Sequence, residues 1–129
     1  MKMGAVPVIA VTSGEPAGIG PELCLRLAER PVRGDSSRMD ARVVVLGDPS
    51  MFAERAKRLN SSVRLRDWNP ANAPLVGTLD VMPLPLEVCA IPGKLDPANS
   101  AYVLNLLDRA LAGCQSGEFA AMVTAPVHK

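Results

Sequence analysis

The segment from residue 13 to residue 22, Ser-Gly-Glu-Pro-Ala-Gly-Ile-Gly-Pro-Glu, is the first that could do chemistry. Its glycines Gly14, Gly18 and Gly20 allow a tight turn or a close backbone approach, and free N–H groups at a following helix N-terminus could hold an anion. Glu15 would oppose an anion unless its carboxylate binds a metal, a cation or a substrate hydroxyl or amine. The glycine spacing matches neither the dinucleotide fingerprint nor the phosphate-binding loop. On spacing alone, a purely structural turn is the simpler interpretation.

The second such segment is Thr124-Ala125-Pro126-Val127-His128-Lys129, which contains the only histidine. The hydroxyl of Thr124, the imidazole of His128 and the ammonium of Lys129 could together bind a phosphate or a carboxylate. One histidine without an aligned acid or thiol completes neither a catalytic triad nor a metal site. The residues alone therefore suggest binding and give no reaction.

Each segment directly follows an apolar run, Val6–Thr12 in the first case and Phe119–Thr124 in the second. Such runs predict strands buried on both faces, as in a parallel sheet. Further strands are predicted at Ala41–Leu46 and Leu79–Met82, with a short edge strand at Val63–Arg66. In open parallel sheets, ligands bind beyond the carboxyl ends of the strands. We therefore expect both segments at the same edge of the sheet.

Three helices are expected between these strands. Pro21 suits a first helical position, and the helix it begins should end before Pro31. Asp48-Pro49 and Asp96-Pro97 are cap-and-proline starts, and Gly117 fits the position after the last helix. The first helix is expected to pack inward with Leu23, Cys24, Leu27 and Ala28. The second is expected to pack inward with Phe52, Ala56 and Leu59, and to expose Glu54, Arg55, Lys57 and Arg58. The third, Ala98–Ser116, is expected to pack inward with Val103, Leu106, Leu107, Ala110, Leu111 and Cys114. Alternating strands and helices predict an α/β fold with a mostly parallel sheet flanked by helices.

Composition narrows the possible functions. With 129 residues the chain has the length of one domain, and a net charge of +1 with 3% aromatic residues gives no support to a nucleic-acid partner. No apolar run approaches the ~18 residues of a membrane span, and the apolar stretch near the N-terminus is interpreted as a strand and not a signal peptide. Cys24, Cys89 and Cys114 are expected to be buried, reduced thiols in a cytoplasmic protein.

The sequence resembles the 4-hydroxythreonine-4-phosphate dehydrogenase family of pyridoxal phosphate synthesis. The resemblance rests on GEPAGIGPE at Gly14–Glu22, GKLDPANSAYVLNLLDRA at Gly93–Ala110 and GEFAAMVTAPVHK at Gly117–Lys129. It implies oxidation of the C3 hydroxyl of 4-phosphooxy-L-threonine with NAD or NADP, followed by decarboxylation to 3-amino-2-oxopropyl phosphate. A divalent metal (Zn, Mg or Co) would polarise the developing ketone.

The same resemblance implies a fold similar to isocitrate and isopropylmalate dehydrogenases, and a homodimer with its active site between two domains. In the family, the histidine metal ligands, most phosphate-binding residues and the dinucleotide site all follow the TAPVHK segment. Residues 1–129 are therefore expected to form the N-terminal part of an α/β substrate-cleft domain, incomplete and inactive alone. Glu15, Thr124, His128 and Lys129 match segments that border the substrate cleft, whereas no metal or cofactor ligand is expected in this chain.

Two alternatives remain open from the sequence. The enzyme could instead oxidise 4-phospho-threonate or 4-phospho-erythronate, because the discrimination of amine from hydroxyl is expected outside this chain. The chain could also be a non-catalytic α/β fragment that binds an anion with the loop from Gly14 to Gly20.

Overall fold

A computed structural model describes residues 6–29 and 41–127 of the chain. Its elements, in chain order, are β1 (Val8–Thr12), α1 (Gly20–Glu29), β2 (Arg42–Gly47), α2 (Pro49–Arg58), β3 (Arg64–Asp67), β4 (Thr78–Pro83), the 3-10 turn η1 (Pro97–Asn99), α3 (Ser100–Ser116) and β5 (Ala121–Thr124). Among these residues, no helix has both the length and the hydropathy that crossing a membrane would require.

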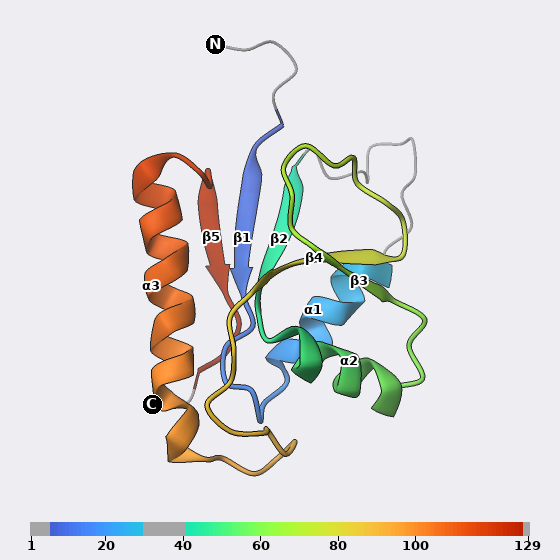
Figure 1. Cartoon of the computed structure of the whole chain (residues 1–129), viewed down its shortest axis with the longest axis vertical. Helices are drawn as coiled ribbons and strands as arrows, with labels where there is room; N and C mark the ends of the chain where they lie inside the picture. The colour runs from blue at the N-terminus through green and yellow to red at the C-terminus, as the bar shows by residue number, and fades with distance from the viewer. Residues whose placement is uncertain (1–5, 30–40, 128–129) are drawn as a thin grey trace.

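The five strands form one sheet in the order β3-β4-β2-β1-β5, and every neighbouring pair is parallel. Ala10 of the central region pairs in register with Val44 on one side and Met122 on the other. Helices α1 and α2 cover one face of the sheet and α3 covers the other (Figure 1). The α/β fold with a parallel sheet that the sequence predicts is therefore confirmed.

Strand β2 shows why the strands of this fold are apolar throughout. Successive side chains point to opposite faces of a sheet. Val44 and Leu46 pack against α3, whereas Val45 packs against α1 and α2, and all three are fully buried. A strand with helices on both faces needs apolar residues at every position. The largely apolar run at residues 41–46 is the sequence pattern that this arrangement requires.

The predicted inward faces of the helices are partly wrong. On α2, Leu59 is 43% exposed, while Arg55, expected outside, is 3% exposed. On α1, Leu23 is exposed and Leu25 is buried in its place. Helical periodicity predicts that residues at i, i+3 and i+4 share a buried face. It does not predict which residues lie at the middle of that face, because this depends on the neighbouring elements. Arg55 is buried because its guanidinium finds acceptors in the loop after β1.

The buried face of α3 is also displaced from the prediction. It consists of Tyr102, Leu106, Ala110 and Gly113, whereas Leu111 is exposed. The helix begins at Ser100, after the 3-10 turn η1, and not at Ala98. Only this narrow strip of the helix is buried against the sheet. The predicted C′ position is confirmed, since Gly117 has a φ of 87°.

Strand β5 was expected to be buried but is largely exposed. It lies at an edge of the sheet, with β1 as its one partner among the described strands, and Val123 is 53% exposed. Phe119, predicted inside the strand, precedes it and packs its ring against Gly113 of α3. An apolar run predicts a strand well, but it does not reveal whether a further strand or helix covers that strand.

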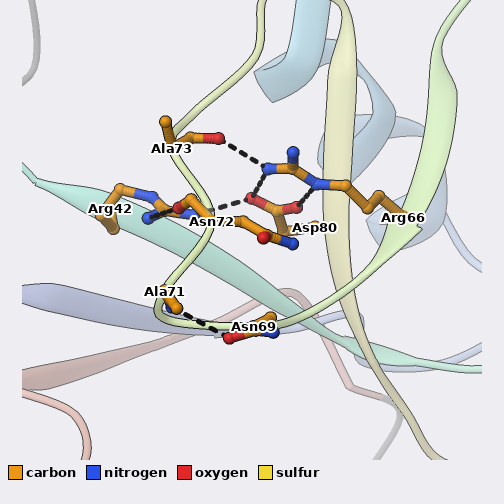
Figure 2. Close-up of polar contacts among 7 residues, drawn as sticks. All are labelled: Arg42, Arg66, Asn69, Ala71, Asn72, Ala73 and Asp80. Carbon is orange, nitrogen blue, oxygen red and sulfur yellow. Dashed lines mark hydrogen bonds and ion pairs between the residues drawn. The ribbon is translucent and has the colours of Figure 1, made fainter.

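Strands β3 and β4 are parallel neighbours joined by residues 68–77 without a helix, so this connection needs other support. The carboxylate of Asp80 on β4 accepts from Arg66 Nε at 2.7 Å and from Arg42 at 3.1 Å. The same two guanidinium groups donate to the carbonyls of Asn72 and Ala73 in the connection (Figure 2). A single carboxylate thus holds two arginines that fasten the connection to the sheet.

We expect Asp80→Asn to lower the free energy of unfolding by about 2–3 kcal/mol, because two poorly exposed guanidinium groups lose their counter-charge. Urea unfolding followed by circular dichroism measures the change. Glu54→Gln is the matched control. It removes a carboxylate from the exposed pair with Arg58 and should change stability by less than about 0.5 kcal/mol. Equal effects of the two substitutions would contradict a structural role for Asp80.

Candidate functional site

The carboxyl ends of all five parallel strands face one edge of the sheet, and the segments that follow β1 and β5 meet there (Figure 1). The amide of Glu15 donates to the carbonyl of Pro126 at 3.1 Å, and the amide of Ala125 donates to the carbonyl of Thr12 at 3.0 Å. The two sequence segments with chemical potential are therefore adjacent in space. His128 and Lys129, however, lie outside the described residues.

This contact between backbones requires glycine at two positions. Gly14 has a φ of 72°, in the left-handed region, and a Cβ there would lie 2.5 Å from the carbonyl oxygen of Pro126. A Cβ on Gly20 would lie 1.9 Å from the carbonyl oxygen of Ser13 and 2.9 Å from Cβ of Ala125. Gly18 has neither feature, since its Cβ would make an ordinary 3.4 Å contact with the Glu15 carbonyl.

The amides of this loop already have acceptors within the protein. The Ala17 amide donates to Oε1 of Glu15 at 3.2 Å, and the Gly18 amide donates to the Glu15 carbonyl at 3.0 Å. With the Glu15 amide bonded to Pro126, three consecutive donors of the loop are unavailable to a ligand. These three amides are therefore not available to an anion. The loop instead presents the half-buried Glu15 carboxylate at the edge of the sheet.

Arg55 holds the same loop from α2, a role that the sequence analysis missed. Its guanidinium donates to the carbonyl of Pro16 at 2.7 Å and to that of Gly18 at 3.1 Å. Burial lowers the pKa of Arg55, partly opposed by the charge of Glu22. The one signal in the sequence is the helical spacing that places Arg55 on the same face as Met51 and Phe52. Amphipathic patterning nevertheless assigns a charged residue such as Arg55 to the solvent-exposed face.

Tyr102 of α3 joins the loops after β1 and β2. Its hydroxyl is hydrogen-bonded to Oγ of Ser13 at 3.2 Å and accepts from the amide of Asp48 at 3.1 Å. The side chain is fully buried, and this burial raises its pKa to about 12, although the hydrogen bond with Ser13 acts in the opposite direction. Ser13 and Asp48 thus keep fixed positions relative to α3.

The extended segment after β4, residues 84–96, crosses the same edge and is fastened at three points. Asp48, which caps α2 through Oδ1, accepts the Leu86 amide with Oδ2 at 2.8 Å. The buried Asn99 accepts the amides of Glu87 and Val88, both at 3.1 Å. The Gly93 amide donates to the Ala17 carbonyl at 2.8 Å, so this segment also braces the loop after β1.

Thr124 ends β5, in register with Thr12, and is exposed. It lies at an apolar hollow of about 350 Å³ between α1 and β5, with Leu23, Val123 and Pro126 among its neighbours. The segments that carry Thr124 and Glu15 are joined by the hydrogen bond from the Glu15 amide to the Pro126 carbonyl. The structure gives no hydrogen bond between the two side chains.

The described residues, 6–29 and 41–127, contain no group of three or more histidine, cysteine or acidic side chains that could hold a metal ion. The glycine spacing in the loop after β1 does not match that of a dinucleotide site. The residues present thus do not fit a divalent metal or a nicotinamide cofactor, and we assign neither to them.

The expectation that all three cysteines are buried is wrong for Cys89. Cys24 is buried, which raises the pKa of its thiol to about 12, and Cys114 is partly buried. Cys89 is exposed because it lies in the extended segment after β4, outside any helix or strand. All three are free thiols, as the sequence analysis expects.

The three loop glycines should respond differently to the addition of one methyl group. We expect Gly14→Ala and Gly20→Ala each to lower the free energy of unfolding by about 2–3 kcal/mol, because the new Cβ meets backbone atoms. Gly18→Ala is the control and should cost less than about 0.5 kcal/mol. Urea unfolding of the three variants provides the measurement. A Gly18 variant as unstable as the others would show that the loop has a different conformation.

Tyr102 is the only tyrosine in the sequence, so its ionisation can be followed by phenolate absorbance. Folding favours the neutral phenol, because its folded pKa of about 12 is above the ordinary tyrosine pKa of 10.0. Stability is therefore unaffected below pH 10, and it falls as the pH rises through the interval between these values. At about pH 11 we expect little phenolate in the native chain and mostly phenolate in urea. Identical titration curves in the two solvents would show an exposed hydroxyl.

Comparison with protein families matches residues 39–129 to the family described as pyridoxal phosphate biosynthetic protein PdxA. Curated relatives include proteins from Azoarcus sp. (strain BH72), 52% identical over 127 residues, and Neisseria meningitidis serogroup B, 50% identical over 124 residues. Both are named 4-hydroxythreonine-4-phosphate dehydrogenase. The matches cover 98% and 95% of this chain, which spans 36% of each relative.

Solved structures agree with these matches. A 4-hydroxythreonine-4-phosphate dehydrogenase from Burkholderia phymatum has a TM-score of 0.81 at 26% identity, over 98% of this chain and 38% of that one. The enzyme of that name from Klebsiella pneumoniae has a TM-score of 0.79 at 31% identity, over 95% of this chain and 38% of that one. A terephthalate 1,2-cis-dihydrodiol dehydrogenase from Burkholderia xenovorans LB400 has a TM-score of 0.67 at 25% identity, over 97% of this chain and 35% of that one.

The fold of these relatives is the type shared with isocitrate and isopropylmalate dehydrogenases, which the resemblance implied. The family match spans well over half of the chain and includes β2 to β5 and the segment after β5. The chain belongs to the PdxA family of pyridoxal phosphate biosynthetic proteins.

Proposed function

We propose that the chain is the N-terminal part of a dehydrogenase that oxidises 4-phosphooxy-L-threonine at C3 with NAD or NADP. The C3 hydroxyl would lose its proton, and the C3–H bond would break with transfer of its hydride to the nicotinamide, which leaves a ketone at C3. The resulting β-keto acid would then lose CO2 to give 3-amino-2-oxopropyl phosphate for pyridoxal phosphate synthesis. Relatives that are 43–52% identical to the chain and carry the name of this enzyme support the assignment.

The observation that carries the proposal is the contact between the loop after β1 and the segment after β5. It brings Glu15 and the segment beginning at Thr124 to the carboxyl edge of a parallel sheet, where ligands of such sheets bind. We propose that this contact forms one wall of the substrate cleft. Glu15 would bind a hydroxyl or amine of the substrate, and Thr124, His128 and Lys129 would border its anionic groups.

Other parts of the complete enzyme would supply the remaining chemistry. A divalent metal provides Lewis-acid polarisation of a developing ketone when it is bound. Because the described residues offer no donor set for it, its ligands would come from outside residues 6–29 and 41–127. From the family resemblance we also propose a nicotinamide site outside these residues, a homodimer and a cytoplasmic location. The 129-residue chain would be inactive by itself.

A hybrid enzyme tests this proposal. Residues 1–129 replace the matched 36% of the Azoarcus relative, and the unmodified relative is the positive control. We expect the hybrid to reduce NAD or NADP with 4-phosphooxy-L-threonine, to lose this activity in a chelator and to recover it with a divalent cation.

A hybrid that folds but does not turn over, beside an active control, would refute the proposal. Turnover of 4-phospho-threonate or 4-phospho-erythronate in preference to 4-phosphooxy-L-threonine would move the assignment to the alternative substrate. Circular dichroism and thermal unfolding establish whether the hybrid is folded.

A further inference from the structure

Arg55 is the one arginine that is buried within the part of the chain that the structure describes. It is 3% exposed, and within the described residues, 6–29 and 41–127, no carboxylate forms a salt bridge with it. Arg58, one helical turn further along α2, is exposed and paired with Glu54. Buried guanidinium groups are normally paired with a carboxylate, because desolvation of an unpaired charge is costly. Something other than ion pairing must therefore account for the position of Arg55.

Both hydrogen bonds from Arg55 go to one short turn. They fix the carbonyls of Pro16 and Gly18, which stand on either side of Ala17. The amide of Ala17 donates to the Glu15 carboxylate, and the amide of Gly18 donates to the Glu15 carbonyl. The guanidinium is planar and presents its donors as a rigid fork, so two bonds set both the position and the orientation of the turn. The same turn orients the side chain of Glu15.

We propose that Arg55 is a positioning residue that holds the loop from Glu15 to Gly18, and with it the Glu15 carboxylate, in the geometry used at the substrate cleft. This inference rests on the proposed function, in which Glu15 binds a polar group of the substrate. Arg55 itself touches no substrate in this arrangement. It acts through the backbone of Pro16 and Gly18.

The surroundings of Arg55 allow a direct chemical test. Its side chain lines a cavity of about 310 Å³ between the first turns of α2 and the segment after β4, with Asp48, Leu86 and Val88 on other walls. In Arg55→Ala, a free guanidinium ion could enter through this cavity and donate to the same two carbonyls. A lysine at this position has one charged nitrogen and cannot reproduce the planar fork.

The first experiment measures hydrogen exchange in the 129-residue chain itself, without reference to activity. We expect the amides of Ala17 and Gly18 to exchange at least about 10-fold faster in Arg55→Lys than in wild type, because the turn loses one of its two supports. Arg58→Lys is the matched control on the same helix and should leave both amides unchanged. Unchanged exchange in a folded Arg55→Lys chain would overturn the proposal.

The second experiment uses the hybrid dehydrogenase. We expect Arg55→Ala to lower kcat/KM by about 10- to 100-fold at a temperature well below its unfolding midpoint, because a small displacement of a site residue reduces rate strongly. Millimolar guanidinium chloride should restore part of the activity, whereas sodium chloride should not. If Arg55→Ala does not fold, Arg55→Lys is used without the guanidinium step, and we expect its kcat/KM to be lower than that of the parent hybrid because lysine cannot reproduce the planar fork.

The outcomes separate the two proposals. An inactive parent hybrid beside an active Azoarcus control would refute the proposed function, and hydrogen exchange would still decide whether Arg55 holds the loop. An active parent with wild-type kcat/KM in a folded Arg55 variant would overturn the positioning role and leave the dehydrogenase assignment intact. Activity loss without guanidinium rescue, in a variant whose loop amides exchange normally, would also contradict the role.

Discussion

The close approach of two backbones at the carboxyl edge of the sheet sets the geometry of this protein. The loop after β1 passes so near the carbonyls of Ala125 and Pro126 that Gly14 has no room for a side chain. Gly20 is equally confined against Ser13, so the loop must turn into α1 at this point. A hydrogen bond from Glu15 to Pro126 joins the two segments. Within the described residues, this contact brings the segments that carry Glu15 and Thr124 together.

Three buried polar side chains hold this edge together, each from a different element. Tyr102 of α3 links Ser13 to the turn after β2, Arg55 of α2 links that helix to the loop after β1, and Asn99 fastens the segment after β4. Backbone groups in loops need hydrogen-bond partners when they are buried. The polar interior at this edge thus replaces the regular hydrogen bonding that the sheet provides elsewhere. A buried polar side chain has a similar part in the β3–β4 connection, because Asp80 holds the two arginines that fasten this connection to the sheet.

Much of this fold is predictable from local sequence, because its strands and caps have clear local signals. The apolar run ending at Thr12 predicts a strand buried on two faces, and Asp48-Pro49 predicts a capped helix start. The burial of Arg55 and Tyr102 is not predictable in this way, since their partners are 37 or more residues distant in sequence. The exposure of β5 also depends on what lies beside the strand. Local pattern identifies elements, whereas long-range partners decide which faces are buried.

In the candidate site, too, local sequence predicts the elements but not the contacts between them. The glycine spacing indicates a tight turn but not which glycines are essential, and the structure separates Gly14 and Gly20 from Gly18. We propose that the contact between the loop after β1 and the segment after β5 forms a wall of the substrate cleft. A crystal structure of the hybrid dehydrogenase with 4-phosphooxy-L-threonine bound tests it most directly. We expect the substrate to contact Glu15 and at least one residue of the segment 124–129. A substrate bound without contact to either segment would contradict the claim.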